Sequence, residues 1–165
     1  MRYIIFFSFL VALLGLRPNL NAQANLDSIY QANLTKKEIN GVYIPASMKE
    51  AFRELVNLSS EASLDKLKAA PEEVAATKLH LGLGKWIAAN WNFYGGSRFT
   101  KHLNELGVSY PDDMIRFTIV SFHRFLNQRD LELEERGAVY DKKREEELNE
   151  RLKNARTIST RKVKN

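Results

Sequence analysis

The sequence predicts a small, compact all-α domain with a short extended lead-in and a long charged C-terminal helix. Proline followed by two acidic residues occurs at Pro71 and again at Pro111. This pattern is typical of helix starts, because proline suits the first helical position and carboxylates favour the positive end of the helix dipole. Apolar residues then recur at helical spacing. The chain has no cysteine, so packing rather than disulfides has to stabilise the fold.

Residues 1–24 have the pattern of a secretory signal peptide. Arg2 precedes an apolar run that ends at Leu16, and Ala22 and Ala24 form a small-residue cleavage pattern. The run is shorter than the ~20 apolar residues that span a bilayer. We therefore expect cleavage after Ala24 and a periplasmic or secreted protein that does not span the membrane. An uncleaved anchor and a buried helix are the alternatives.

The rest of the chain divides by composition into three parts. Residues 25–40 form a polar lead-in, residues 41–128 a helical domain of unknown function, and residues 129–165 a charged helix with a basic tail. The net charge of +5 falls to +3 when the signal peptide removes two arginines. This excess is mild, so specific nucleic-acid binding is not expected. The tail from Arg151 contains six basic residues and no acid, and is either solvated or in contact with an anionic partner.

The first part of the domain combines an extended segment with a capped helix. Residues 41–45 end at Pro45, which disfavours helix at the preceding position. Ser47 and Glu50 have the spacing of a capping box. The helix that follows places on one face the apolar residues Met48, Ala51, Phe52, Leu55 and Val56.

A second helix is predicted over residues 71–90, with two glycines in its middle. Gly82 and Gly84 each cost ~1 kcal/mol relative to alanine inside a helix. Either the helix breaks at these glycines or another part of the chain approaches closely there. The sequence leaves both possibilities open.

Two further helices are predicted on either side of Gly107. Ser97 is a plausible N-cap for a helix over residues 98–106, and Gly107 is the usual left-handed stop. The next helix begins at Pro111 and runs to about residue 127. Its apolar stripe is wide, which is typical of a helix at the centre of a core: Ile115, Phe117, Ile119, Val120, Phe122, Phe125 and Leu126.

Residues 80–114 hold both tryptophans and two of the three histidines. Four short motifs occur there in order: His-x-Gly-Leu-Gly-x-Trp from His80, Asn90-Trp91, Gly96-Ser97-Arg98 and Pro-Asp-Asp-Met from Pro111. With these motifs, residues 41–127 resemble a family of short bacterial domains of unknown function. The resemblance implies a domain and brings no activity with it.

The turn before residue 98 is a candidate ligand site. Glycine backbone amides, the N-terminus of a helix and the guanidinium of Arg98 favour an anion next to Ser97. A capped turn with Arg98 paired to an aspartate is the structural alternative. Asp113 and His80 complete the candidate site, and Trp91 is expected to form its hydrophobic wall. Core packing is the alternative for the tryptophans.

We expect a non-enzymatic binding or interaction module with a protein or anionic ligand, and no cofactor or metal. A small hydrolase is the first alternative, with His80 or His123 acting together with Asp112 or Asp113. A toxin-neutralising or envelope assembly partner is the second alternative. The charged C-terminal helix would then bind the partner. The hydrolase requires a histidine within hydrogen-bond reach of a carboxylate, in an open cleft.

Overall fold

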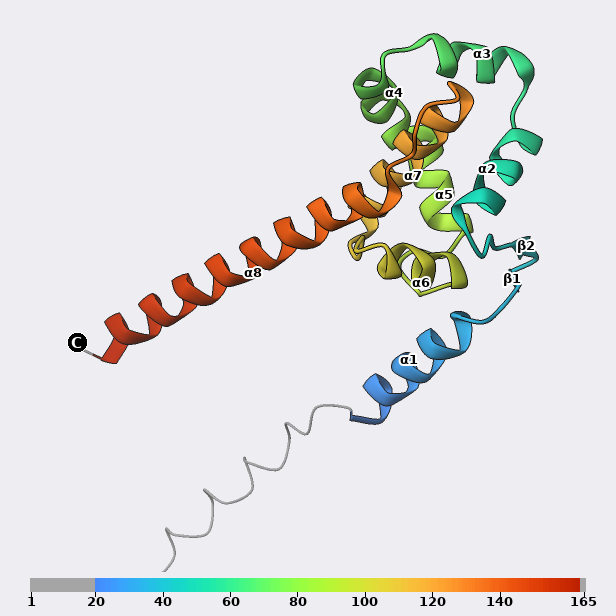
Figure 1. Cartoon of the computed structure of the whole chain (residues 1–165). Coiled ribbons are helices and arrows are strands. Elements are labelled where there is room, and N and C mark those ends of the chain that lie inside the picture. The colour runs from blue at the N-terminus through green and yellow to red at the C-terminus, as the bar shows by residue number, and fades with distance from the viewer. Residues whose placement is uncertain (1–19, 164–165) are drawn as a thin grey trace, which may run out of the picture.

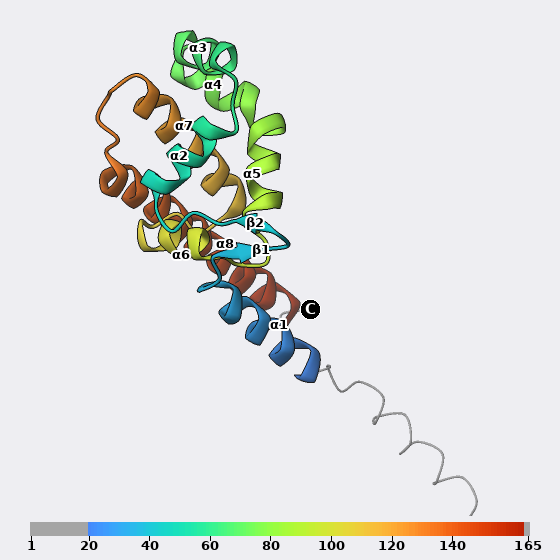
Figure 2. The same cartoon turned by 90° about the vertical axis from the view of Figure 1, so that its right-hand side faces the viewer.

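The computed structural model describes residues 20–163 of the chain, and side chains from residue 24 to residue 155. Within this part the fold is all-α, as predicted, except for one antiparallel strand pair (Figures 1 and 2). The strands are Glu38–Ile39 (β1) and Val42–Tyr43 (β2). Asn40 and Gly41 between them both have positive φ, which is the geometry of a two-residue hairpin turn. The predicted extended segment is therefore half of a hairpin.

A helix occupies the region predicted as a polar lead-in. Helix α1 spans Leu20–Asn33 and is largely exposed, with Leu26 and Ile29 on its surface. Its sequence has no strong apolar face, and this is why the helix was not predicted. Residues 1–19 of the predicted signal peptide lie outside the described residues.

Helices α2, Met48–Asn57, and α3, Glu61–Ala69, both start at serine caps. The Ser47 hydroxyl accepts a hydrogen bond from the Glu50 amide at 3.3 Å. The Glu50 carboxylate, however, reaches the amide of Ala46, one residue before the cap. The predicted apolar face of α2 is confirmed, since its apolar residues face the core: Met48, Ala51, Phe52, Leu55 and Val56.

The helix predicted over residues 71–90 is interrupted at its glycines. It consists of α4, Glu72–Leu79, a π-helical turn η1, His80–Gly84, and α5, Lys85–Asn90. A Cβ atom at Gly84 would lie 2.4 Å from Cγ2 of Ile115. Both possibilities that the sequence left open therefore apply. The helix changes its hydrogen bonding at the glycines, and Gly84 lets it approach α7 closely.

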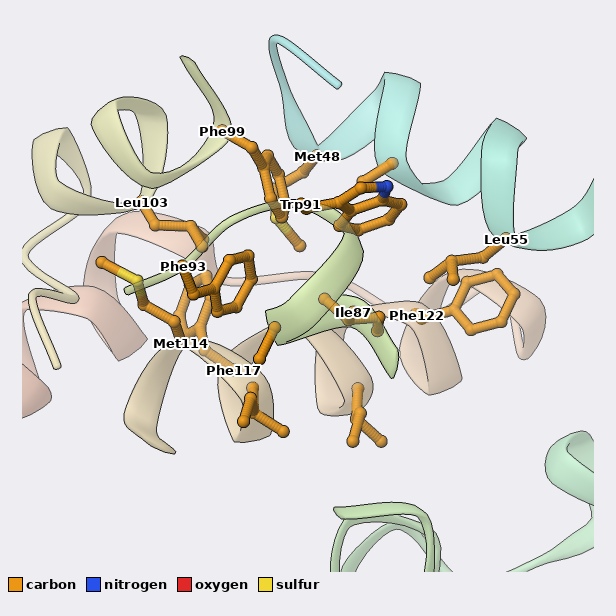
Figure 3. Close-up of a cluster of buried hydrophobic side chains, with 14 of the residues drawn as sticks. Met48, Leu55, Ile87, Trp91, Phe93, Phe99, Leu103, Met114, Phe117 and Phe122 are labelled. Carbon is orange, nitrogen blue, oxygen red and sulfur yellow. The ribbon is translucent and has the colours of Figure 1, made fainter. Parts of the chain in front are cut away.

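Helices α6, Arg98–Glu105, and α7, Pro111–Leu126, match the predicted boundaries to within one residue. Gly107 has a φ of +88°, as expected for a helix stop. Helix α7 runs through the middle of the domain and contacts α2, α3, α4, α5 and η1. Figure 3 shows side chains from α2 and α5–α7 packed together, including Trp91, Phe99 and Phe117. The predicted central position of α7 is confirmed.

Helix α8, Leu133–Val163, has two different halves. Its first turns pack on the domain, where Tyr140 meets the ring of Phe117 at 5.9 Å. A Cβ at Gly137 would lie 1.7 Å from the carbonyl oxygen of Leu106, so this glycine allows two backbones to cross. Beyond Arg144 most described side chains are exposed, and the helix extends away from the body (Figure 1).

Candidate functional site

Ser97 is fully buried and uses both of its polar groups within the turn. Its hydroxyl accepts from the Thr100 amide at 3.2 Å, and its own amide donates to the Thr100 hydroxyl at 2.8 Å. This reciprocal capping box satisfies two of the free amides at the start of α6. The hydroxyl and amide that were expected to face a ligand therefore have partners inside the protein.

The glycines before Ser97 are covered by α1. Gly96 has a φ of +77°, and a Cβ there would lie 2.5 Å from the ring of Tyr30. The Asn33 amide donates to the carbonyl oxygen of Gly95 at 3.0 Å. Tyr30 thus occupies the space beside the turn in which an anion was expected. We refer to residues 95–98 as the corner.

Arg98 holds the corner to the segment that precedes α2. Its Nε donates to the carbonyl oxygen of Ile44 at 2.6 Å, and its Nη2 lies 3.6 Å from Oε2 of Glu50. The Ala46 amide and the Tyr43 hydroxyl also donate to Glu50. These two hydrogen bonds and the charge of Arg98 hold the pKa of this carboxyl below its ordinary value of 4.5. Arg98 is paired with Glu50, not with an aspartate of α7.

Asp113 holds α8 to the domain. It is 7% exposed, and Arg144 Nε donates to its carboxylate at 2.7 Å. The Arg144 guanidinium also lies 4.1 Å from the centre of the Tyr110 ring. A carboxylate this buried needs its charged partner. The described contacts therefore give Asp113 a role in anchoring the long helix.

His80 and Asp112 approach each other without forming a hydrogen bond. His80 Nε2 lies 3.9 Å from Asp112 Oδ1, and the His80 side chain is partly exposed while that of Asp112 is largely exposed. This separation exceeds the reach that proton transfer requires. His123 is 4% exposed, and its Nδ1 lies 4.0 Å from Glu72. The described geometry does not bring either histidine into the arrangement that the hydrolase hypothesis needs.

Trp91 packs in the core and is 1% exposed. Its ring meets Phe99 edge-on at 5.1 Å and Trp86 at 6.2 Å. In Figure 3 it lies between α2 and α5, among other apolar side chains. The structure thus gives separate partners to Ser97, Arg98, Asp113 and Trp91, while His80 lies near Asp112 at the start of α7.

A polar stripe on α7 fastens the connection between α3 and α4. The stripe consists of Arg116, His123 and Asn127. In the structure His123 Nε2 lies 2.8 Å from the carbonyl oxygen of Ala70, and Asn127 donates to the carbonyl oxygen of Lys68 at 3.2 Å. Arg116 pairs with Glu73. The stripe therefore meets backbone carbonyls and a carboxylate of the neighbouring segments.

Helices α3 and α4 border a pocket of about 570 Å³ that is partly open to solvent, which we call the α3–α4 pocket. Its walls come from α3, α4 and η1, and Phe122 of α7 also lines it. Mostly apolar side chains line the pocket: Ser59, Ser63, Leu64, Lys66, Leu67, Ala70, Val74, Ala75, Lys78, Leu79, Leu83 and Phe122. Sequence reasoning missed this site. The nearest signal in the sequence is the glycine pair Gly82 and Gly84, which interrupts the predicted helix. In the structure these glycines lie in the π-helical turn that contributes Leu83 to the pocket, and such turns often mark functional sites.

The described residues offer no obvious metal or membrane-spanning site. Within residues 24–155, no three His, Asp or Glu side chains gather where they could hold a metal ion. Among the helices described, none is both long and apolar enough to cross a bilayer. The candidate functional site is the largely apolar α3–α4 pocket.

The fold and the pocket define a small all-α domain with a largely apolar pocket at its surface. Its sequence matches DUF6794, a domain of unknown function, over residues 44–126. This match covers half of the chain, and the protein therefore belongs to that family. The chain matches no curated protein and no solved structure.

Proposed function

We propose that the protein is a non-enzymatic binding module that takes an apolar group into the α3–α4 pocket. The pocket itself carries the proposal. Ligand sites are typically clefts of ~300–1,000 Å³ with mainly apolar walls and a few polar groups. Leu67, Leu79, Leu83 and Phe122 supply such walls, and the two serines and two lysines of the lining are the polar groups.

The pocket supports a binding function better than the corner does. At the corner, Ser97 and Arg98 already have internal hydrogen-bond partners, and Tyr30 fills the adjacent space. A ligand there would have to displace these contacts, with the loss of the hydrogen bonds that it replaced. We therefore propose the α3–α4 pocket, and not the corner, as the ligand site of this non-enzymatic binding module.

We also propose that the protein works outside the cytoplasm, in the periplasm or as a secreted protein. The apolar run that follows Arg2 and the alanines at positions 22 and 24 support this proposal. Expression of the full chain in a bacterial host, followed by N-terminal sequencing of the periplasmic fraction, tests it. A mature N-terminus at Asn25 is expected. An intact Met1 in the cytoplasmic fraction would contradict the proposal.

The binding function is tested with N-phenyl-1-naphthylamine, an uncharged dye that fluoresces in apolar sites. We expect the full chain without its signal peptide to bind the dye, and Val74→Trp to reduce the affinity at least about tenfold. Val74 lines the pocket and is 38% exposed, so a larger side chain there fills the pocket without entering the core. Fluorescence titration gives both dissociation constants.

Thr77→Trp is the matched control. Thr77 is also exposed on α4 but does not line the pocket, so this variant should bind the dye as the unchanged protein does. Circular dichroism should show equal helix content in all three proteins. Absence of dye binding, or equal binding by the two tryptophan variants, would contradict the proposed function.

A further inference from the structure

The charged residues that line the α3–α4 pocket are all positive. Lys66 comes from α3 and Lys78 from α4, and the lining contains no aspartate or glutamate. Both lysines are exposed. Ion pairs such as Lys101–Glu105 and Lys142–Glu146 occur elsewhere in the chain, but within the described residues neither Lys66 nor Lys78 forms one. The pocket thus combines an apolar interior with two unpaired positive charges.

We infer that the pocket binds a free single-chain anionic amphiphile, such as a medium-chain carboxylate. Its aliphatic chain would pack against Leu67, Leu79 and Phe122, while its head group would lie between Lys66 and Lys78. Lysine supports this arrangement, because its stem packs on apolar surface while its ammonium group stays in water. This inference rests on the proposed function and adds the sign of the ligand's charge.

The helix dipole offers a competing explanation for the positions of Lys66 and Lys78. Lys66, Lys68 and Lys78 all lie in the last turn of a helix, where a positive charge favours the helix dipole. Lys68 has this position but does not line the pocket. It therefore separates the two explanations, since a lysine kept only for the helix dipole has no effect on ligand binding.

The test compares two dyes that differ by one charged group. 1-Anilinonaphthalene-8-sulfonate is the uncharged dye N-phenyl-1-naphthylamine with an added sulfonate. We expect the unchanged protein to bind the sulfonated dye more tightly, and the doubly substituted Lys66→Gln, Lys78→Gln variant to lose that advantage. Each lysine is expected to contribute roughly two- to fivefold, as exposed ion pairs do. Added salt should reduce the advantage.

The uncharged dye distinguishes a failure of the proposed binding function from a failure of the charge inference. Its affinity should be equal in the unchanged protein and in the double variant, because it carries no charge for the lysines to meet. If it does not bind at all, the proposed function fails. If it binds but the sulfonate brings no advantage, or Lys68→Gln removes the advantage as fully as the double variant does, only the charge inference is overturned.

Competition then identifies the kind of amphiphile. Decanoate should displace the sulfonated dye at concentrations several-fold lower than decanol, which has the same chain length without the charge. Equal displacement by the two would overturn the inference. Displacement by phosphatidylglycerol vesicles but not by decanoate would also overturn it, because the surface would then recognise a membrane rather than a free molecule.

Discussion

The corner at residues 95–98 leads into α6, whereas α3 and α4 line the α3–α4 pocket. Helix α6 and the pair α3 and α4 lie at opposite ends of the helical body (Figures 1 and 2). The corner is built from distinctive residue types, yet Ser97 and Arg98 find partners within the protein. The pocket is lined mainly by common apolar residues. Its two charged residues, Lys66 and Lys78, form no ion pair among the described residues. Residue types that stand out in a sequence can therefore hold the fold together, while a binding pocket can be lined by common apolar residues.

The largest expected effect tests whether the distinctive residues belong to the scaffold. Trp91→Ala should lower the free energy of unfolding by about 3–5 kcal/mol, the usual cost of removing a large buried aromatic side chain. Trp91 is 1% exposed and packs on Phe99. Urea denaturation measures the loss. Trp86→Ala is the control, because Trp86 is 38% exposed. Equal losses of unfolding free energy in the two variants would mean that the buried position of Trp91 adds nothing to the stability of the fold.

A smaller effect sharpens the contrast between the two regions. Arg98→Ala should cost roughly 1–3 kcal/mol, because the carbonyl oxygen of Ile44 loses its donor. Lys66→Ala in the pocket should change stability by less than about 0.5 kcal/mol. Thermal unfolding of both variants measures the difference. A loss at Lys66 as large as that at Arg98 would give the pocket lysine a structural role.

The smallest expected effect is a pH dependence that arises at the corner. The pKa of Glu50 is lowered in the folded protein by its hydrogen bonds to Ala46 and Tyr43 and by Arg98. The unfolded chain therefore takes up this proton first as the pH falls. The stability that Glu50 supplies is complete above pH 4.5 and is lost as the pH falls through the lowered pKa of the folded protein.

Glu50→Gln removes this dependence and gives a direct measurement. The difference in unfolding free energy between the two proteins should shrink as the solution is acidified below pH 4.5. His102, whose pKa is lowered by burial, is present in both proteins and cancels in the difference. A difference that stays constant over this range would mean that the ionised form of Glu50 is not favoured by folding.

Most of the fold could be predicted from the sequence because its signals are local. Ser47, Ser97, Gly107 and Pro111 mark helix ends through interactions within a few residues. Helix α1 escaped prediction because it has no strong apolar face. Tyr30 and Asn33 attach its end to glycines more than sixty residues away, and no local pattern indicates such a contact.

The pocket could not be predicted for the same physical reason. Its shape depends on how α3 and α4 meet α7, and His123 fixes that arrangement by a contact with Ala70, 53 positions earlier in the chain. The partner of Arg98 is similarly distant, at Ile44. Sequence spacing identified both side chains as unusual. It did not identify their partners, since each side chain meets a distant backbone carbonyl, which no side-chain pattern marks.

Helix α8 crosses close to Leu106 at Gly137 and then projects from the domain. The helix has 31 residues, which corresponds to a rod of about 46 Å. Among the contacts described above, those of its first turns, up to Arg144, hold it against the domain. The remainder extends for roughly 28 Å at the rise of an α-helix. A molecule in contact with the far end of α8 would therefore be held at about that separation from the domain, at a distance set by helix length.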